Sequence, residues 1–394
     1  MRRFRTLCLL SASALLCTAC AASPANTPTE PVPKQKARPP VTFSTPAPDP
    51  VETLLASLTL VEKVGQVFFV RCPSQNAVSD VADYHLGGYI LFGRDFKDKS
   101  AEQVRAALSS YQDASDIPLL LGVDEEGGTV VRVSSNPQLR SHKFASPQRL
   151  YAQGGWDAIR SDTAEKDALL SSLGINVNLA PVADVSTDPS DFIYARSFGQ
   201  DAAATAEYVR TVVTQMQADG MGSVLKHFPG YSSNPDTHTG IAIDQRPYET
   251  FVVSDFLPFQ IGYTTSTQTT AILISHNIIQ NIDSTLPASL SPIVHNILRE
   301  ELGFDGVAMT DDLAMDAAAA YAADGSAAVL ALQAGNDLIV TTDYRMQIPQ
   351  VLQAVETGTL STETIDEACR RVLTWKAALG LLENSTAESA ATSK

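Results

Sequence analysis

The chain has 394 residues, of which 44% are hydrophobic, and it carries a formal net charge of −16 at pH 7. This length and composition suffice for a large buried core, built as two or three domains or as one barrel. The acidic balance argues against a nucleic-acid partner, because such binding depends on lysine and arginine side chains that neutralise phosphates.

The amino terminus has the pattern of an export signal. The basic segment MRRFR precedes the apolar stretch TLCLLSASALLCTAC, which is too short to span a membrane. Its end resembles a lipoprotein signal, with a small Thr-Ala pair before Cys20, although Cys17 stands where a branched aliphatic residue is usual. We predict a signal peptide over residues 1–19 and lipidation of Cys20, which would anchor an exported protein to a bacterial membrane, at the cell surface or facing the periplasm. Plain secretion is the alternative.

The two ends of the chain have compositions that do not form a packed core. Residues 20–50 are rich in proline and poor in aromatic residues, which is typical of a semi-rigid tether. Residues 383–394 form a polar tail, so the folded part is expected over residues 51–382. Within it Cys72 and Cys369 are expected to be free thiols, since no spacing indicates a disulfide framework or a zinc cluster.

Between residues 51 and 382, short apolar runs alternate with longer amphipathic stretches. Apolar runs without polar alternation are typical of parallel strands buried on both faces. The runs begin at Gly65, Gly87, Pro118, Asn176, Gly222, Ala271, Gly306 and Asp337. These strand–helix units predict an α/β fold, a single-domain (β/α)8 TIM-type barrel, because eight strands close more naturally than they form an open sheet. No G-x-G-x-x-G opens a helix, so a dinucleotide site has no support.

Polar side chains follow these runs, at the strand ends where (β/α)8 barrels place their chemistry. In chain order they are Arg94, Asp95, Asp124, Glu125, Glu126, Asp184, Lys226, His227, His276, Asn277, Asp311, Asp312 and Asp343. We expect them to converge on one rim of the barrel, although each alone would also suit a solvated loop or a helix N-cap.

The acids and arginines near this rim suit a polyhydroxylated ligand. Asp312 suits a helix N-cap, whereas Asp311 suits the carboxylate nucleophile that retaining glycoside hydrolysis requires. Asp124 can accept hydrogen bonds from sugar hydroxyls. Arg132 has valine neighbours and is expected to be partly buried and paired, and Arg196 lies in an aromatic, glycine-bearing loop.

The segment VLKHFPGYSSNPDTHTG carries the remaining candidates. Lys226 and His227 end the fifth run and are expected at the rim; a satisfied core histidine is the alternative for His227. Asp236 lies two residues before His238, where a carboxylate can orient an imidazole that donates and recovers a proton. Metal ligation is the competing interpretation, but the acids and histidines lack ligand spacing, so we expect neither metal nor cofactor.

Together, KHFPG followed by D-x-H, VDEEGG, GINVNLAPVADV, RSFG and TDDLAM resemble the β-N-acetylhexosaminidases of glycoside hydrolase family three. The match extends from Glu62 to Ala377 and covers the whole expected barrel. The resemblance implies a (β/α)8 fold and retaining exo-cleavage of terminal β-linked N-acetylglucosamine through a covalent glycosyl-enzyme, with peptidoglycan fragments or chito-oligosaccharides as substrates.

The resemblance also implies roles for individual residues. Asp311 would be the nucleophile, His238 the acid/base and Asp236 its orienting partner. The sugar would be bound by Asp124, Arg132, Arg196, Lys226 and His227. A histidine acid/base departs from the usual pair of carboxylates. The chain departs from the family where Tyr231-Ser232-Ser233 replaces the common His-Gly-Asp in a loop one residue shorter, which favours a different aglycone preference.

Three other functions fit part of the pattern. The β-glucosidases and β-xylosidases of the same family share the nucleophile motif but usually take their acid/base from a second domain. A glycoside phosphorylase would use the same covalent intermediate, because a histidine acid/base repels phosphate less than a carboxylate does. A tethered, non-catalytic sugar-binding lipoprotein would have two lobes and no need of an Asp-His pair. For the leading function we expect a monomer that binds saccharides and meets a membrane only through its anchor.

Overall fold

The computed structural model describes residues 49–235, 241–315, 318, 320–321 and 327–382. They belong to one compact unit of the chain, Pro48–Lys394. The predicted signal peptide, Cys20 and polar tail lie outside the described residues. The predicted tether extends two residues too far, because Asp49 caps helix α1 (Pro50–Ser57) and Pro50 is its first residue. Proline suits that position, since its fixed φ is helical and the missing N–H would have no partner there.

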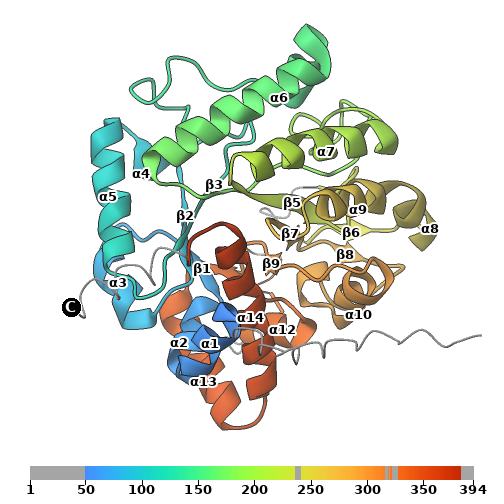
Figure 1. Ribbon diagram of the computed structural model, residues 1–394. Coiled ribbons are helices and arrows are strands. Elements are labelled where there is room, and N and C mark those ends of the chain that lie inside the picture. The colour runs from blue at the N-terminus through green and yellow to red at the C-terminus, as the bar shows by residue number, and fades with distance from the viewer. Residues whose placement is uncertain (1–48, 236–240, 316–317, 319, 322–326, 383–394) are drawn as a thin grey trace, which may run out of the picture. The chain divides into compact units, whose positions relative to one another are not determined.

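Parallel strands form a barrel in the order β10-β1-β2-β3-β4-β5-β7-β9 (Figure 1). Their bounds are β1 Phe68–Arg71, β2 Gly88–Leu91, β3 Leu120–Val123, β4 Val177–Asn178, β5 Gly222–Phe228, β7 Thr270–Ile274, β9 Ala308–Thr310 and β10 Ile339–Thr341. The Met309–Leu338 bridge joins β9 to β10, where Thr310 N donates to Leu338 O at 3.1 Å. Each strand overlaps one of the eight predicted runs, although β1 ends one residue after its run, at Arg71, and β7 begins one residue before its run, at Thr270. The predicted barrel is confirmed. Two short strands, β6 Ile243–Asp244 and β8 Ile278–Ile279, pair beside it.

Helices surround the strands in Figure 1. Their remaining bounds are α2 Leu60–Gln66, α3 Ala77–Tyr84, α4 Gly93–Phe96, α5 Ala101–Asp113, α6 Pro147–Leu173, α7 Ala202–Ala218, α8 Tyr248–Thr250, α9 Phe256–Thr265, α10 Pro292–Asn296, α12 Ala327–Ala334, α13 Tyr344–Glu356 and α14 Thr362–Ala378. Single turns of other helix types lie at η1 Phe251–Asp255, η2 Ala288–Leu290 and η3 Ile297–Glu301. Gly220 (φ +71°) and Gly380 (φ +72°) follow α7 and α14 in the left-handed conformation that is common after the last residue of a helix.

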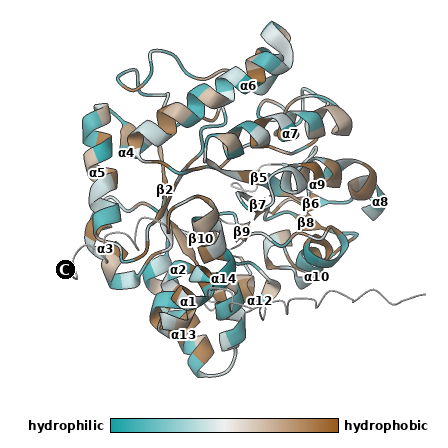
Figure 2. Cartoon of the chain, viewed as in Figure 1, coloured by the Kyte–Doolittle hydropathy of each residue, from teal (hydrophilic) through white to brown (hydrophobic). Residues whose placement is uncertain are grey.

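Strand residues alternate between two apolar clusters. Phe68 and Val70 pack outward against the helices, whereas Phe69 points into the barrel, where Trp375 of α14 joins the inner cluster. Figure 2 accordingly shows hydrophobic strands and helices of mixed hydropathy. This two-sided burial explains why the runs read as continuously apolar.

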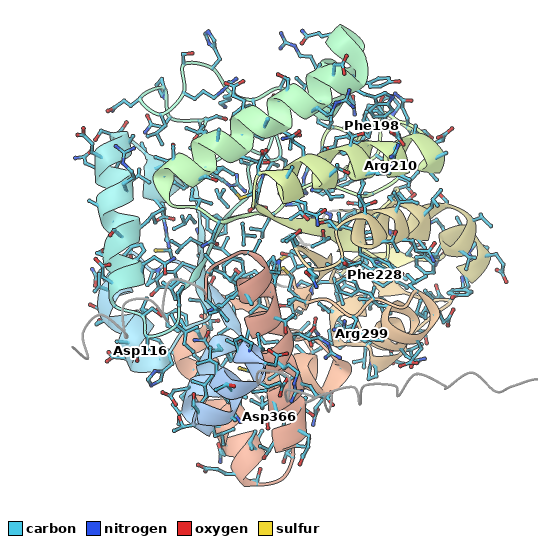
Figure 3. The ribbon with its side chains drawn as sticks, viewed as in Figure 1. Asp116, Phe198, Arg210, Phe228, Arg299 and Asp366 are labelled. Atoms are coloured by element: carbon cyan, nitrogen blue, oxygen red, sulfur yellow. The ribbon has the colours of Figure 1, made fainter. Side chains whose placement is uncertain are left out.

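Outer packing is partly aromatic. Phe228, labelled in Figure 3, stacks on Phe256 at 5.6 Å between ring centroids and meets Phe259 edge-on at 5.2 Å. Cys72 and Cys369 are both buried, free thiols, and burial raises the pKa of each to about 12. Among the described residues, no helix combines the length and the apolar character needed to cross a bilayer.

Candidate active site

A cavity of about 610 Å³ opens at the carboxyl ends of the barrel strands. The predicted site residues that line it are Asp124, Arg132, Arg196, Lys226, His227 and Asp311. The structure therefore brings together every predicted site residue that it describes. Asp236 and His238 lie outside the described residues.

Lys226 is the centre of a buried ionic network on one side of this cavity. Its side chain is 2% exposed, and its Nζ lies 2.6 Å from both Asp124 Oδ1 and Glu126 Oε1. Arg196 donates two hydrogen bonds to Glu126, from Nε to Oε2 at 3.0 Å and from Nη2 to Oε1 at 2.7 Å. Arg132 approaches Asp124 Oδ2 at 3.9 Å, which agrees with its predicted partial burial and pairing.

The network keeps its members charged. Burial alone would raise the pKa of Glu126, but the positive charges of Arg196 and Lys226 outweigh it and hold that pKa well below its usual range. Burial would likewise lower the pKa of Lys226, but the charges of Asp124 and Glu126 outweigh it and raise that pKa. Around neutral pH this wall therefore presents fixed ammonium, guanidinium and carboxylate groups.

His227 has partners for both ring nitrogens and still lines the cavity. Nδ1 lies 2.7 Å from Oδ2 of Asp184, whose side chain is fully buried. Nε2 lies 3.2 Å from Arg196 Nη2. Because a guanidinium can only donate, Nε2 accepts and the ring proton sits on Nδ1. Asp184 also accepts from Tyr231 N at 2.7 Å, so one carboxylate fixes the imidazole and the start of the following loop.

Asp311 lies at the carboxyl end of β9 and lines the cavity. Its N donates to Ile274 O at 3.2 Å, and its Oδ1 accepts from Asp312 N at 2.9 Å. Asp312 Oδ1 accepts from Ala314 N at 3.0 Å and so holds a turn. Its role as a helix N-cap stays a prediction, because most of the expected helix lies outside the described residues. Both adjacent acids line the cavity, and the Asp312 carboxylate also holds the following turn.

The predicted convergence of polar residues is incomplete. His276 and Asn277 are buried away from the cavity, and His276 contacts Ser289 Oγ (2.7 Å) and Asp312 O (3.1 Å) instead. Glu125 is also buried, and it accepts from the backbone N of Arg132 and Val133 at 2.8 and 2.7 Å. The side chains of Glu125 and His276 thus hold loops in place. Arg94 and Asp95 likewise do not line the cavity.

Sequence reasoning missed two residues that line the cavity. Arg71 ends β1, and its guanidinium carbon lies 4.3 Å from the ring centroid of Phe92, which follows β2. The signal was present, because Arg71 is a charged residue that ends an apolar run, like Lys226.

Both stems of the loop that carries the predicted Asp-His pair are anchored. On one side, Asn234 Nδ2 donates to Asp244 Oδ2 at 2.8 Å. On the other, Arg246 Nη2 donates to the same oxygen at 2.8 Å, and its Nη1 donates to Asp255 Oδ1 at 2.9 Å. Arg246 Nη2 also reaches Gly230 O at 3.4 Å. One buried carboxylate, Asp244, therefore ties the two stems together.

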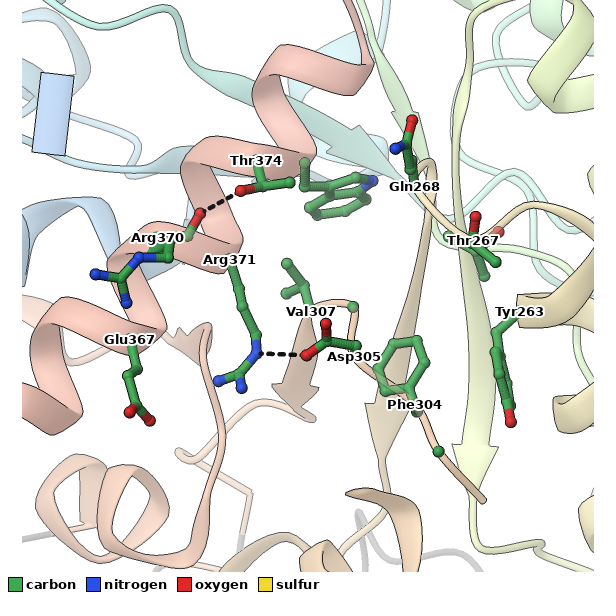
Figure 4. A pocket seen from close by; sticks show the side chains of 14 residues that line it. Tyr263, Thr267, Gln268, Phe304, Asp305, Val307, Glu367, Arg370, Arg371 and Thr374 are labelled. Atoms are coloured by element: carbon green, nitrogen blue, oxygen red, sulfur yellow. Dashed lines mark hydrogen bonds and ion pairs between the residues drawn. The ribbon is translucent and has the colours of Figure 1, made fainter. Parts of the chain in front are cut away.

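A second cavity, of about 490 Å³, lies at the amino ends of the strands. Figure 4 shows Phe304 and Tyr263 on one side of it and Arg371 facing Asp305, with 3.7 Å between Nε and Oδ1. Barrel enzymes carry out their chemistry at the carboxyl ends of the strands, so this second cavity is not the candidate active site.

The barrel has a carboxylate at the end of β9 and, across its mouth, charged side chains that can form hydrogen bonds with sugar hydroxyls. This is the architecture of a barrel glycosidase. The chain belongs to the family described as glycosyl hydrolase family 3 N terminal domain, whose model matches residues 59–375. The family resemblance predicted from the motifs is therefore confirmed.

The relatives agree with this family. The chain is 32% identical to "Beta-hexosaminidase LpqI" of Mycobacterium tuberculosis over 394 residues, covering 94% of this chain and 97% of the relative. It is 30% identical to a "Beta-hexosaminidase" of Xanthomonas campestris pv. campestris, covering 71% and 84%.

Solved structures give the same result. A family 3 β-N-acetylglucosaminidase from Paenibacillus sp. str. FPU-7 superposes with a TM-score of 0.76 at 30% identity, covering 82% of this chain and 63% of that chain. The structure of M. tuberculosis LpqI superposes with a TM-score of 0.75 at 29% identity, covering 83% and 96%.

Proposed function

We propose that this protein is a retaining exo-β-N-acetylglucosaminidase that releases terminal β-linked N-acetylglucosamine from peptidoglycan fragments or chito-oligosaccharides. The observation that carries the proposal is the shared cavity, which places Asp311 and the Lys226 network in one barrel mouth. The curated relatives named β-hexosaminidases support the choice of an N-acetylhexosamine over glucose or xylose.

The side of the cavity that holds the Lys226 ionic network suits a neutral sugar. Asp124, Lys226, Arg196, Arg132 and His227 offer donors and acceptors whose positions are fixed before the sugar arrives. Fixed partners cost little reorganisation on binding, so hydroxyl recognition orients the anomeric carbon toward Asp311.

The reaction then has two steps. An Asp311 carboxylate oxygen bonds to the anomeric carbon while the glycosidic C–O bond breaks, and His238 gives its proton to the leaving oxygen. His238 next takes a proton from water, whose oxygen attacks the anomeric carbon and releases Asp311. Asp236 orients His238 and favours its protonated form. No metal or cofactor takes part in this scheme.

The anchored stems support the loop's role in this scheme. Asp244 binds Asn234 before the Asp-His pair and Arg246 after it, so the chain leaves and re-enters the barrel at fixed points. A non-catalytic sugar-binding lipoprotein would need two lobes, whereas the described residues form one barrel. Export and lipidation of Cys20 remain part of the proposal; loss of acyl labelling in Cys20→Ser would test them.

Substrate choice is tested with the purified barrel on aryl β-N-acetylglucosaminide and aryl β-glucoside, each with and without inorganic phosphate. We expect faster release from the N-acetylglucosaminide, with free N-acetylglucosamine as product. Faster release from the glucoside would contradict the substrate assignment, and a sugar 1-phosphate product would identify a phosphorylase.

The acid/base role is tested with His238→Gly. We expect a disaccharide, whose leaving oxygen needs a proton, to slow by about 10²- to 10⁴-fold in kcat/KM, and an activated aryl substrate to slow far less. His142→Gly, which removes an exposed histidine, is the matched control. Equal losses on both substrates would remove His238 from the acid/base role.

A further inference from the structure

Arg71 is a cation of the cavity that makes no ion pair with any described residue. It ends β1 and lines the cavity. Within the described part of the chain, its guanidinium has no ion-pair partner, and its Nε is buried without a hydrogen-bond partner. A partly buried arginine is ordinarily paired, because an unpaired charge costs solvation.

Other partly buried arginines of the chain show the usual pattern. Arg196 holds Glu126, Arg299 holds Asp337 and Arg246 holds Asp244, all through charged hydrogen bonds. The chain carries a net charge of −16, so carboxylates are not scarce. The lack of an ion pair between Arg71 and the other described residues is therefore explained by its position in the cavity.

Phe92 fixes the orientation of this guanidinium. The Arg71 guanidinium carbon lies 4.3 Å from the ring centroid of Phe92, and that of Arg132 lies 5.7 Å from the same centroid. Stacking uses the face of a guanidinium and leaves its N–H edges free to donate. Arg132 Nε is likewise buried without a hydrogen-bond partner among the described residues. Two guanidiniums beside one ring thus keep unused donors at the cavity.

The nearest acidic residues among the described ones do not form an ion pair with Arg71. Asp95 accepts from Phe92 N at 2.7 Å and forms its ion pair with Arg94. Asp343 follows the neighbouring strand, since Val70 of β1 is in register with Thr341 of β10, yet no ion pair among the described residues joins it to Arg71. The free donors of Arg71 therefore have no acceptor from the described protein.

Arg71 also lies across the mouth from the sugar-binding network. In the barrel order, β1 is four strands away from β5, which carries Lys226 and His227. A sugar bound at the Lys226 network leaves the β1 side of the cavity to the remainder of the substrate. A planar guanidinium with free N–H edges matches a carboxylate in two-point geometry.

We propose that Arg71, stacked on Phe92, binds a carboxylate carried by the aglycone and so makes the enzyme selective for acidic saccharides. This inference rests on the proposed function. Inorganic phosphate is the other source of a matching anion, and the experiment separates the two.

The test compares two disaccharides that differ only in one charge, N-acetylglucosaminyl-β-1,4-N-acetylmuramic acid and its methyl ester. In Arg71→Gln we expect the acid-to-ester ratio of kcat/KM to fall by about 10- to 100-fold, mainly through KM, the loss typical of one charged hydrogen-bonded contact. Arg71→Lys should restore part of the ratio. Arg105→Gln, an exposed charge on α5, should leave the ratio unchanged. Melting temperatures identify any variant that is not folded.

Each other outcome contradicts the proposal in a distinct way. If both Arg71 variants lost kcat/KM equally on the acid and on the ester, Arg71 would not bind the carboxylate. Acceleration of the wild type by inorganic phosphate that disappears in Arg71→Gln would assign the anion to phosphate. Wild-type protein without activity on aryl β-N-acetylglucosaminide would refute the proposed function itself, independently of Arg71.

Discussion

The two sides of the barrel mouth use charge differently. The side formed by β3, β4 and β5 buries Glu126, Lys226 and Asp184, and each has a partner of opposite charge or a hydrogen-bonding imidazole. The side formed by β10, β1 and β2 carries Arg71, Phe92 and Asp343, with no ion pair between them in the described residues. Glu126, Lys226 and Asp184 on the first side are paired, whereas the Arg71 donors on the second side have no acceptor among the described residues.

This difference follows from the cost of burying charge. A buried ion is tolerated when geometry and hydrogen bonds offset the loss of water, and removal of one partner then leaves an uncompensated charge. The paired side is therefore rigid and suited to neutral hydroxyls. The side formed by β10, β1 and β2, here called the open side, is suited to contact the part of the substrate that differs between substrates. The paired side and the open side should therefore respond differently to substitution.

Lys226→Met should break the paired side and have the largest effect. It leaves the Asp124 and Glu126 carboxylates at the cavity without their ammonium partner, so we expect the free energy of unfolding to fall by about 3–5 kcal/mol. Denaturant unfolding measures this loss. Arg210→Met, which removes an exposed pair with Glu207, should cost at most about 1 kcal/mol. Similar losses of unfolding free energy in both variants would mean that the buried network contributes no more to stability than an exposed ion pair.

Asp167→Asn tests an unpaired buried acid away from the barrel mouth, through the pH dependence of stability. Asp167 is a buried carboxyl on α6 whose oxygens have no hydrogen-bond partner in the described residues. Burial, then the negative charge of Asp219, raises its pKa to about 8, while the neighbouring Lys166 forms its ion pair with Asp162.

The sign of this pH dependence follows from the raised pKa. Between about pH 4 and pH 8 the folded protein keeps a proton on Asp167 that the unfolded chain releases, so stability falls as pH rises, by up to about 1.4 kcal/mol per pH unit. Urea unfolding at several pH values should show this slope in the wild type and a flatter one in Asp167→Asn. Asp157→Asn, at an exposed site, should keep the wild-type slope; equal slopes in all three proteins would show that Asp167 is already ionised.

The strands and the paired side could be predicted because both depend on local pattern and on one topological rule. Apolar runs between helical stretches located the strands, and the rule that strand ends meet at one rim brought Asp124, Lys226 and Asp311 together. The same rule failed for His276 and Asn277, which also follow a strand. The His276 side chain contacts η2 and the loop after β9, an orientation set by tertiary packing that leaves no periodic signal in the sequence.

Arg71 and Phe92, on the side formed by β10, β1 and β2, were missed for a similar reason. The contact of Arg71 with Phe92 depends on the register of β1 with β2, where Arg71 lies opposite Ile90, and a single sequence does not give that register. The central role of Glu126 was also hidden, because three consecutive acids in VDEEGG do not reveal which one faces Lys226.

The most direct test of the central claim is to trap the glycosyl-enzyme with a slowly hydrolysed, fluorine-substituted N-acetylglucosaminyl donor and map the labelled peptide by mass spectrometry. The account predicts one sugar bound through an ester to Asp311, and no adduct in Asp311→Asn. A label on Asp312 or Asp124, or an active enzyme that forms no covalent adduct, would contradict it.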